Sequence, residues 1–263
     1  MKRHVRLLLQ YFAQYAKVRL AYKADFIIAF FSSMAATVLG FGFVLVLFSK
    51  IPRLQDWSFN ELMFLYGFSL LPLGFFNVVS WNLYDFSELY IIEGKFDRVL
   101  LRPVSTLFQV VFEKFRLESL QEVVTGIVVV ALCLQRLHLT LQIIDYLWFA
   151  LMIVCGTAIY LAVFLMLTAV SFWFEDRVGI VPPVFNMLNF GRYPLTIYNV
   201  FIQFMLSWII PFGFATFYPT THFLGRTAFT PYFHLVPAVA VGFSALAIVV
   251  WNRGVGNYSS TGT

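Results

Sequence analysis

The sequence predicts an all-α integral membrane protein with six transmembrane helices, built as one transmembrane domain over residues 1–263. Charged residues make up only 12% of the chain, against roughly 25% in soluble globular domains. Apolar residues make up 60%, and Phe alone occurs 32 times. Several uncharged runs exceed the roughly 20 residues that a helix needs to cross the hydrocarbon core. These runs are too uniformly apolar for barrel strands, so the lipid bilayer must solvate much of the surface.

The first element is an amphipathic helix over residues 1–23 that lies in the membrane interface. Its apolar residues recur at helical spacing, and its basic and amide residues take the other face: Val5, Leu8, Leu9, Phe12, Ala16 and Leu20 against Arg3, Arg6, Gln10, Gln14 and Lys17. A plain extension of the first span is the alternative. This stretch lacks an apolar core that ends in a small-residue cleavage site, so we expect no cleavable signal peptide.

We expect the six spans at residues 26–48, 62–84, 117–134, 146–172, 197–216 and 230–251. The fifth lies in an uncharged run, 193–225, that is too long for a single crossing. Pro211, Gly213 and Pro219 interrupt its second half, so we place a re-entrant segment between the fifth and sixth spans. The stretch 178–191 contains Pro182-Pro183 and is too short to cross, so we expect it to be interfacial.

The basic residues are divided unequally between the two ends of these spans. All but four of the 18 Lys and Arg residues fall on the side of the two termini, and the four are Lys50, Arg53, Arg136 and Arg226. Cytoplasmic connections carry the excess of Lys and Arg. We therefore expect a multi-pass protein of a bacterial-type inner (plasma) membrane with both termini in the cytoplasm.

The sequence lacks the motifs of nucleotide and metal chemistry. Gly94-Lys95 is followed by Phe96 and has no upstream glycine, so it is not a phosphate-binding loop. The four histidines do not pair at helical spacing: His4, His138, His222 and His234. We expect no catalytic residue, no cofactor and no metal in this chain. The net charge of +5 reflects membrane orientation, so we expect no nucleic-acid partner.

Two carboxylates fall at the start of the third span. Lys114, Glu118 and Glu122 lie at i, i+4 and i+8, on one face of one helix. Glu118 and Glu122 could act in coupling or in contact with cargo, because charged groups in spans are costly and often functional. The alternative, which we favour, is a third helix that projects into the cytoplasm, with Lys114 and Arg116 neutralising its acids.

The connection after the second span, Leu89 to Pro103, alternates apolar and charged residues over a short distance. Phe96, Val99 and Leu100 are set against charged neighbours, Gly94 permits a turn, and Pro103 ends the helix. A solvated loop is the alternative, but a solvated loop needs no paired leucines. The pattern favours a short amphipathic helix that docks a cytoplasmic partner.

Three stretches resemble one family of membrane proteins, the ABC-2 type ABC transporter permeases. They are Glu93-Gly94-Lys95-Phe96-Asp97 with Arg98 and Leu100-Leu101-Arg102-Pro103, then Phe190-Gly191-Arg192-Tyr193-Pro194, then Pro211 with Tyr218-Pro219. The chain is similar throughout its length to the six-span members known as uncharacterised ABC transport system permease components. The resemblance implies the ABC-2 type permease fold.

The resemblance also implies a function. Such a permease is the membrane subunit of an ATP-driven transporter, usually an exporter, and is not itself an enzyme. ATP and Mg would be held by a separate cytoplasmic ABC ATPase, and a second permease chain, identical or related, would complete the pathway. The stretch Glu93 to Pro103 would be the coupling helix that enters the ATPase, and the N-terminal helix would be the elbow at the interface.

Small and polar residues within the spans are candidates for the pathway lining: Ser32, Ser33, Thr37, Asn77, Ser80, Asn199 and Gln203. Their alternative role is packing and hydrogen bonding between helices. The aromatic content of 19% favours an amphiphilic or apolar cargo. A stand-alone secondary transporter and a non-transporting membrane scaffold remain as rival functions, because they would show the same hydropathy.

Overall fold

The computed structural model describes residues 10–14, 17, 22–174 and 181–259. The interfacial helix expected over residues 1–23 therefore lies mostly outside the described residues. Within that stretch, residues 10–14 and Lys17 are helical, and the ring centroids of Phe12 and Phe115 lie 5.5 Å apart.

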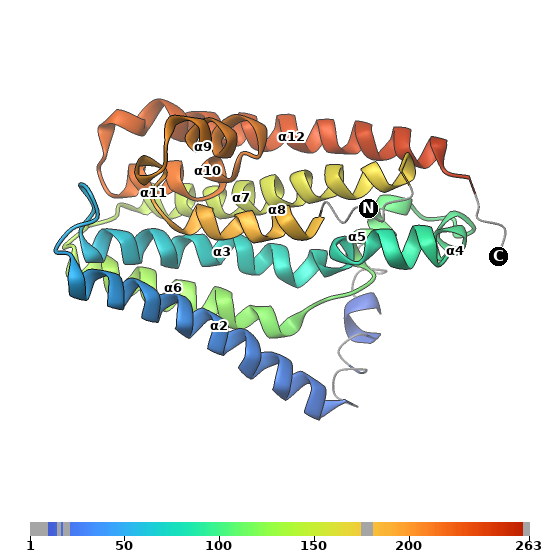
Figure 1. The fold of residues 1–263 in the computed structure, drawn as a ribbon, viewed down its shortest axis with the longest axis horizontal. Coiled ribbons are helices and arrows are strands. Elements are labelled where there is room, and N and C mark those ends of the chain that lie inside the picture. The colour runs from blue at the N-terminus through green and yellow to red at the C-terminus, as the bar shows by residue number, and fades with distance from the viewer. Residues whose placement is uncertain (1–9, 15–16, 18–21, 175–180, 260–263) are drawn as a thin grey trace.

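Five long helices form a bundle (Figure 1): α2 (Lys23–Lys50), α3 (Phe59–Tyr84), α6 (Leu120–Arg136), α7 (Ile143–Ala169) and α12 (Thr230–Asn257). With the short turns that extend some of them, each is long and apolar enough to cross a membrane. Five of the six expected spans fall on these helices. Most residues of α3 are buried, because α6 and α7 pack along its two sides.

We name the two ends of the bundle after a buried residue at each. The Trp57 end carries the connections 51–58, 137–142 and 224–229. The Phe96 end carries η1 (Ser87–Ile92), which continues α3, then α4 (Phe96–Leu100), α5 (Thr106–Phe112) and the C-terminal end of α12. From there η2 (Leu117–Ser119) leads into α6, and η3 (Val170–Phe172) ends α7 on the same side.

Local chemistry explains where α3 begins. Ser58 and Glu61 form a capping box, in which the Ser58 N–H donates to Glu61 Oε2 at 2.9 Å and the Glu61 N–H donates to Ser58 Oγ at 3.4 Å. Arg226 adds an ion pair to Glu61 at 3.0 Å. The start of α3 is thereby fixed to the connection that precedes α12.

Glycine residues bring α3 and α6 into close contact. A Cβ atom on Gly126 would lie 2.8 Å from the carbonyl oxygen of Gly67, and one on Gly74 would lie 2.7 Å from the Val123 side chain. Small residues allow helix backbones in membranes to approach each other closely. These glycines therefore allow α3 and α6 to pack closely against each other.

The fifth passage through the bundle is formed by residues 181–197, which differs from the expected span over 197–216. α8 (Val181–Met187), η4 (Leu188–Arg192) and η5 (Leu195–Ile197) run antiparallel to α3. Phe185 packs on Tyr84, near the Phe96 end, with ring centroids 5.4 Å apart. Thr196 Oγ1 accepts a hydrogen bond from the indole of Trp57 at 3.0 Å. By Thr196 the chain has thus passed from the Phe96 end of the bundle to the Trp57 end.

Two physical reasons account for this difference from the prediction. Pro182 and Pro183 lie in the first turn of α8, where the backbone N–H groups have no helical partner, so proline removes no hydrogen bond there. Val184 and Leu188 are buried, and α8 packs against α7. Irregular backbone is tolerated at membrane depth when protein, and not lipid, surrounds it.

Residues 200–223 enter the bundle from the Trp57 end and return to it. α9 (Val200–Phe204) with η6 (Met205–Ile209) is followed by α10 (Phe212–Ala215) with α11 (Phe217–Phe223), and the two halves are bent by 71° at Pro211. Phe212 packs on Tyr160, with ring centroids 5.1 Å apart. After η7 (Thr227–Phe229) the chain enters α12. Arg226 donates to the Asp56 carbonyl at 2.9 Å, so the re-entrant segment ends where it began.

Candidate functional site

The segment Glu93 to Pro103 forms a turn, a short helix and an exposed tip at the Phe96 end. Gly94 has φ of +68°, a backbone conformation that other residues adopt only with strain. This residue turns the chain after η1, and α4 starts two positions later. The sequence therefore folds here as the turn and helix signals predict.

Phe96 anchors this segment in the bundle. Its side chain is fully buried, and four rings surround it at centroid distances of 5.0–6.2 Å: Phe86, Phe172, Trp251 and Tyr258. Such ring pairs contribute about 0.5–1.5 kcal/mol each beyond the burial itself. Because the rings come from the ends of α3, α7 and α12, the segment is tied to three long helices at once.

The apolar residues of the segment divide between core and surface. Phe96 and Val99 are buried, whereas Leu100 is 44% exposed and Leu101 is 85% exposed. The alternation predicted Leu100 on the same apolar face as Phe96 and Val99; the structure instead places it at the surface. We call Leu100 and Leu101 the leucine tip. These two leucines are the apolar side chains of the segment that the rest of the bundle leaves uncovered.

The charged residues of the segment make specific contacts. Lys95 pairs with Glu93 at 2.5 Å, and Asp97 Oδ1 accepts a hydrogen bond from Tyr258 at 3.1 Å. Partial burial, together with this hydrogen bond to a carboxylate, raises the pKa of Tyr258 to about 12. Tyr258 therefore links the end of α12 to α4 throughout the physiological pH range.

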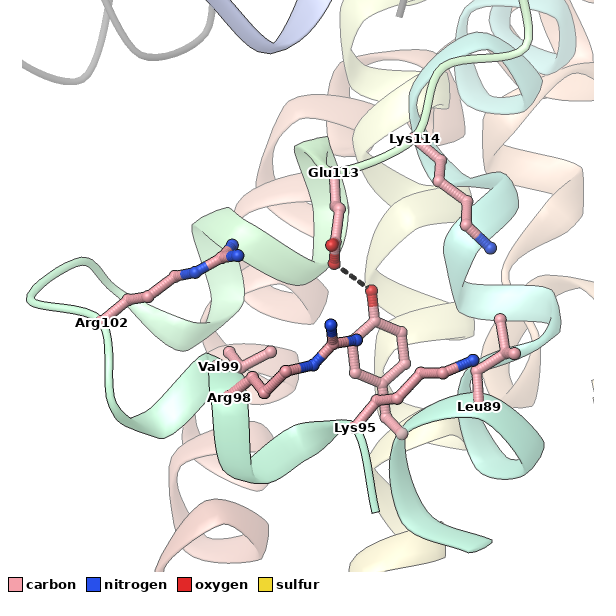
Figure 2. Close-up of a pocket in the computed structure, with 8 residues that line it drawn as sticks. Leu89, Lys95, Arg98, Val99, Arg102, Glu113 and Lys114 are labelled. Carbon is pink, nitrogen blue, oxygen red and sulfur yellow. Dashed lines mark hydrogen bonds between the residues drawn. The ribbon is translucent and has the colours of Figure 1, made fainter. Parts of the chain in front are cut away.

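A cavity of about 170 Å³ lies behind α4 (Figure 2), and its wall comes from η1, α4 and the region around α5. The lining residues are Leu89, Tyr90, Lys95, Arg98, Val99, Arg102, Glu113 and Lys114. The Tyr90 hydroxyl donates to the Glu113 carboxylate and accepts from Asn82 Nδ2 at 2.6 Å. The wall of this cavity thus contains four cationic side chains and one carboxylate.

A second group of polar residues lies between α2, α3 and α6, within the membrane-spanning part of the bundle. Asn77 Nδ2 donates to Glu122 Oε2 at 2.8 Å, and Gln121 Nε2 donates to Ser33 Oγ at 3.1 Å and to Thr37 Oγ1 at 3.2 Å. All except Ser33 are buried. We call these five residues the polar stripe. Oδ1 of Asn77 and Oε1 of Gln121 have no hydrogen-bond partner among the described residues.

A cation lies on the same side of α3. Arg192 Nη1 donates to the Tyr66 hydroxyl at 3.0 Å, and its Nε has no partner among the described residues. A Cβ atom on Gly40 of α2 would touch that same hydroxyl. Ser33, Thr37 and Gly40 share one face of α2, so this helix covers both the polar stripe and the Arg192–Tyr66 pair.

The remaining predicted pathway residues have local roles. Ser80 donates to the Phe76 carbonyl, Asn199 caps α9 by accepting from the Ile202 N–H at 2.9 Å, and Gln203 donates to the Tyr198 carbonyl at 2.8 Å. The structure does not bring these three into the polar stripe. Ser32 is exposed on α2.

Glu118 and Glu122 occupy different environments. The buried Glu118 pairs with Arg116 at 3.6 Å, and the Arg116 guanidinium lies 4.1 Å from the centre of the Trp81 ring. Of the two cations expected to neutralise these acids, Arg116 is thus the one that pairs with Glu118. Glu122, in contrast, is bound by an amide and belongs to the polar stripe.

Sequence reasoning missed three residues of these groups, namely Tyr66, Gln121 and Arg192. Each is a hydrogen-bonding side chain within or next to an apolar run, and that signal was available. Arg192 was used as a cation of a connection and as part of a family motif but not as a site residue, because residues 181–197 were expected to lie outside the spans. Among the described residues, no three His, Cys, Asp or Glu side chains come together as a metal site.

Comparison with known proteins identifies the chain. No curated protein and no solved structure matches it. A family model described as ABC-2 family transporter protein matches residues 32–262, which takes in all five long helices apart from the first turns of α2. This agrees with the resemblance carried by the three sequence stretches and with a multi-pass helical fold. The chain therefore belongs to the ABC-2 family of transporter proteins.

Proposed function

We propose that this chain is the transmembrane permease subunit of an ATP-driven exporter and that a separate cytoplasmic ATPase drives it through the leucine tip. The observation that supports this most is the combination of an exposed tip with a buried anchor. Leu101 is 85% exposed, whereas Phe96, five residues earlier, is fully enclosed by rings from three helices. ATP and Mg²⁺ would then act on the partner chain, and the export direction is the one the family resemblance implies.

The anchor offers a route for the coupling movement. A displacement of α4 would act directly on Phe86 next to η1, on Phe172 at the end of α7 and on Trp251 in α12. Aromatic rings packed at these distances cannot slide past one another without losing contact, so the helices would follow. The hydrogen bond between Asp97 and Tyr258 supports the same link.

We further propose that the polar stripe lines the cargo pathway, at the boundary with a second permease chain that is identical or related. α2 covers the stripe, but Thr37 and Val44 are its buried residues, and Leu39 on another face is 73% exposed. Of the five long helices, α2 is thus the one least enclosed by the rest of the bundle. An amphiphilic cargo fits hydrogen-bonding groups that are surrounded by apolar helix surface.

The distribution of basic residues supports the orientation. The Phe96 end carries Lys95, Arg98, Arg102 and Lys114, and by the positive-inside rule it would face the cytoplasm of a bacterial-type inner membrane. Both termini would then be cytoplasmic. In this orientation the leucine tip would lie on the side from which a cytoplasmic ATPase could reach it.

The test of coupling is co-purification of the chain with its cognate ATPase, encoded beside it or supplied by co-expression. Leu101→Glu should reduce the yield of the complex about tenfold or more, because it puts a charge into an apolar contact. Thr140→Glu, on the exposed connection at the Trp57 end, is the matched control and should leave the yield unchanged. Full yield and full ATPase stimulation with Leu101→Glu would refute the role of the tip.

Transport itself distinguishes the rival functions. In liposomes that hold the permease and the ATPase, ATP-dependent movement of an amphiphilic probe should stop when either protein is omitted. Movement driven by the permease alone would identify a secondary transporter. A stable complex without any ATP-dependent movement, and without stimulation of ATP hydrolysis by candidate cargo, would identify a scaffold.

A further inference from the structure

Four cationic side chains surround one cavity at the Phe96 end. Figure 2 shows Lys95, Arg98, Arg102 and Lys114 around the space of about 170 Å³, with Glu113 as the one carboxylate in the wall. The four come from three different parts of the chain: the start of α4, the turn after it, and the residues that follow α5. The fold, and not a run of adjacent basic residues, therefore brings them together.

The charges in the wall are not balanced by the protein. Lys95 has Glu93 as a partner at 2.5 Å, and the Glu113 carboxylate accepts from the Tyr90 hydroxyl. Within the described part of the chain, no salt bridge is formed by Arg98, Arg102 or Lys114. Like charges held near each other repel, and the repulsion falls when an anion enters between them. The cavity thus favours an anionic occupant.

The walls are held in place by buried hydrogen bonds. Gln109 of α5 donates from Nε2 to the carbonyl of Val99 at 3.0 Å and to that of Val104 at 2.9 Å, which fixes both sides of the turn that carries Arg102. Asn82 ties Tyr90 to the Val110 carbonyl in the same way. A cavity with walls fixed in this way loses little entropy when a ligand binds.

Phosphate is the anion that fits this set of donors. Arginine offers a planar fork that bonds two phosphate oxygens at once, and lysine adds a point charge. The space of about 170 Å³ is large enough to admit a phosphate group and part of its ester substituent. Lys114 lies two residues from Arg116, which stacks on Trp81, and paired tryptophan and arginine side chains are typical of the membrane interface.

We infer that this cavity binds the phosphate group of an anionic ligand, either a soluble phosphate ester or the headgroup of an anionic phospholipid. A bound phosphate would join η1, α4 and the end of α5, and so would stiffen the segment that carries the leucine tip. The inference uses the cations behind α4 and not the tip itself. It therefore stands whether or not the tip binds an ATPase.

The first arm of the test is isothermal titration of the purified chain in neutral detergent with inorganic phosphate and pyrophosphate at constant ionic strength. Wild type should bind saturably, and Arg98→Gln/Arg102→Gln should bind about tenfold more weakly or worse. The matched control is Arg53→Gln/Arg136→Gln, which removes two exposed arginines at the Trp57 end. This control should bind within about twofold of wild type.

The second arm measures lipid. The chain is reconstituted into vesicles of phosphatidylcholine alone or mixed with phosphatidylglycerol, re-extracted, and its retained lipid is counted by mass spectrometry. Cavity-dependent retention of phosphatidylglycerol, without binding of free phosphate, would assign the site to a headgroup; the reverse would assign it to a soluble ester. If the Gln variant does not fold, Arg98→Lys/Arg102→Lys replaces it and should bind more weakly than wild type, because lysine lacks the fork.

The inference fails if neither probe distinguishes the cavity variant from the Trp57-end control. It also fails if both variants lose binding equally, because that would show attraction by net charge alone. These measurements use the chain without an ATPase. Failure of the leucine-tip experiment would therefore not affect the phosphate-binding result. Failure of the phosphate-binding tests would likewise not affect the leucine-tip experiment.

Discussion

Single atoms decide whether α3 and α6 can pack. A Cβ atom on Gly126 would lie 2.8 Å from a backbone oxygen of α3, whereas one on Gly42 of α2 would meet nothing within 4 Å. Gly126→Val should therefore lower the free energy of unfolding by about 1–3 kcal/mol, as overpacking does in other cores. Gly42→Val is the matched control and should change it little. Thermal unfolding in detergent measures both, and equal losses would show that the glycine contact is unimportant.

The phenol of Tyr258 predicts a pH dependence of stability. Its pKa is raised from 10.0 to about 12 by burial and by Asp97, so the folded state holds this proton more tightly than the unfolded state. The stabilisation is complete below pH 10 and is lost as the pH rises through about 12. Between these values wild type should lose stability more steeply than Tyr258→Phe. Unfolding curves that fall in parallel for the two proteins would contradict the raised pKa.

At the scale of elements, two glycines allow an effect on stability to be separated from an effect on binding of the ATPase. Gly94 and Gly225 have φ of +68° and +71°, and both precede a helical segment, one at each end of the bundle. Alanine at either position should cost about 1 kcal/mol of stability, because a Cβ strains this conformation. Only Gly94→Ala should also weaken co-purification with the ATPase, because it displaces α4. Equal weakening by Gly225→Ala would mean that lost stability, and not the turn, is responsible.

The elements that could be predicted from the sequence are those whose signal is local. Long uncharged runs predicted α2, α3, α7 and α12, and a shorter apolar run predicted α6. Gly94 and Pro103 marked the turn and short helix of the segment Glu93 to Pro103. The burial of Phe96 followed from its place in the alternation. The exposure of Leu100 did not follow from that alternation.

The fifth passage could not be predicted, because its signal is not local. Residues 181–197 cross the bundle as a series of short helices. Their position depends on contacts with α3 and α7, which are distant in the sequence. The uncharged run 193–225 is longer and more apolar than residues 181–197, so hydropathy favoured it as the place of the fifth span. The polar stripe was found in part for a similar reason. Asn77, Thr37 and Glu122 are visible in the sequence as polar residues of spans, but no local signal shows that Asn77 binds Glu122 or that Thr37 binds Gln121 of another helix.

The arrangement of the whole molecule makes a clear labelling prediction. Val200 is 80% exposed at the start of the re-entrant segment, and Gly225 is exposed after it. Cysteines placed at Val200, Gly225 and Arg53 should all react with a membrane-impermeant maleimide from one side of the membrane. A cysteine at Arg102 should react only from the other side. The chain's own Cys133 and Cys155 are buried and should react slowly.

This experiment separates the two arrangements of the fifth passage. If residues 197–216 crossed the membrane as one helix, Val200 would be labelled together with Arg102, on the side opposite Gly225. If the cysteine at position 200 is labelled from the same side as the one at position 53, the chain must have completed its crossing before Val200. Labelling of the cysteine at position 102 from the cytoplasmic side would also establish the proposed orientation.

The continuity of α3 with η1 has a mechanical consequence. Together they run for 34 residues, about 50 Å, while the hydrocarbon core is only about 30 Å thick. This helical path, which bends at Asp85, is therefore long enough to reach from one edge of the hydrocarbon core to well beyond the other. A tilt of about 10° around its midpoint would swing each tip by about 4 Å in opposite senses. A modest displacement of α3 on one side of the bilayer would in this way change the arrangement of the helices on the opposite side.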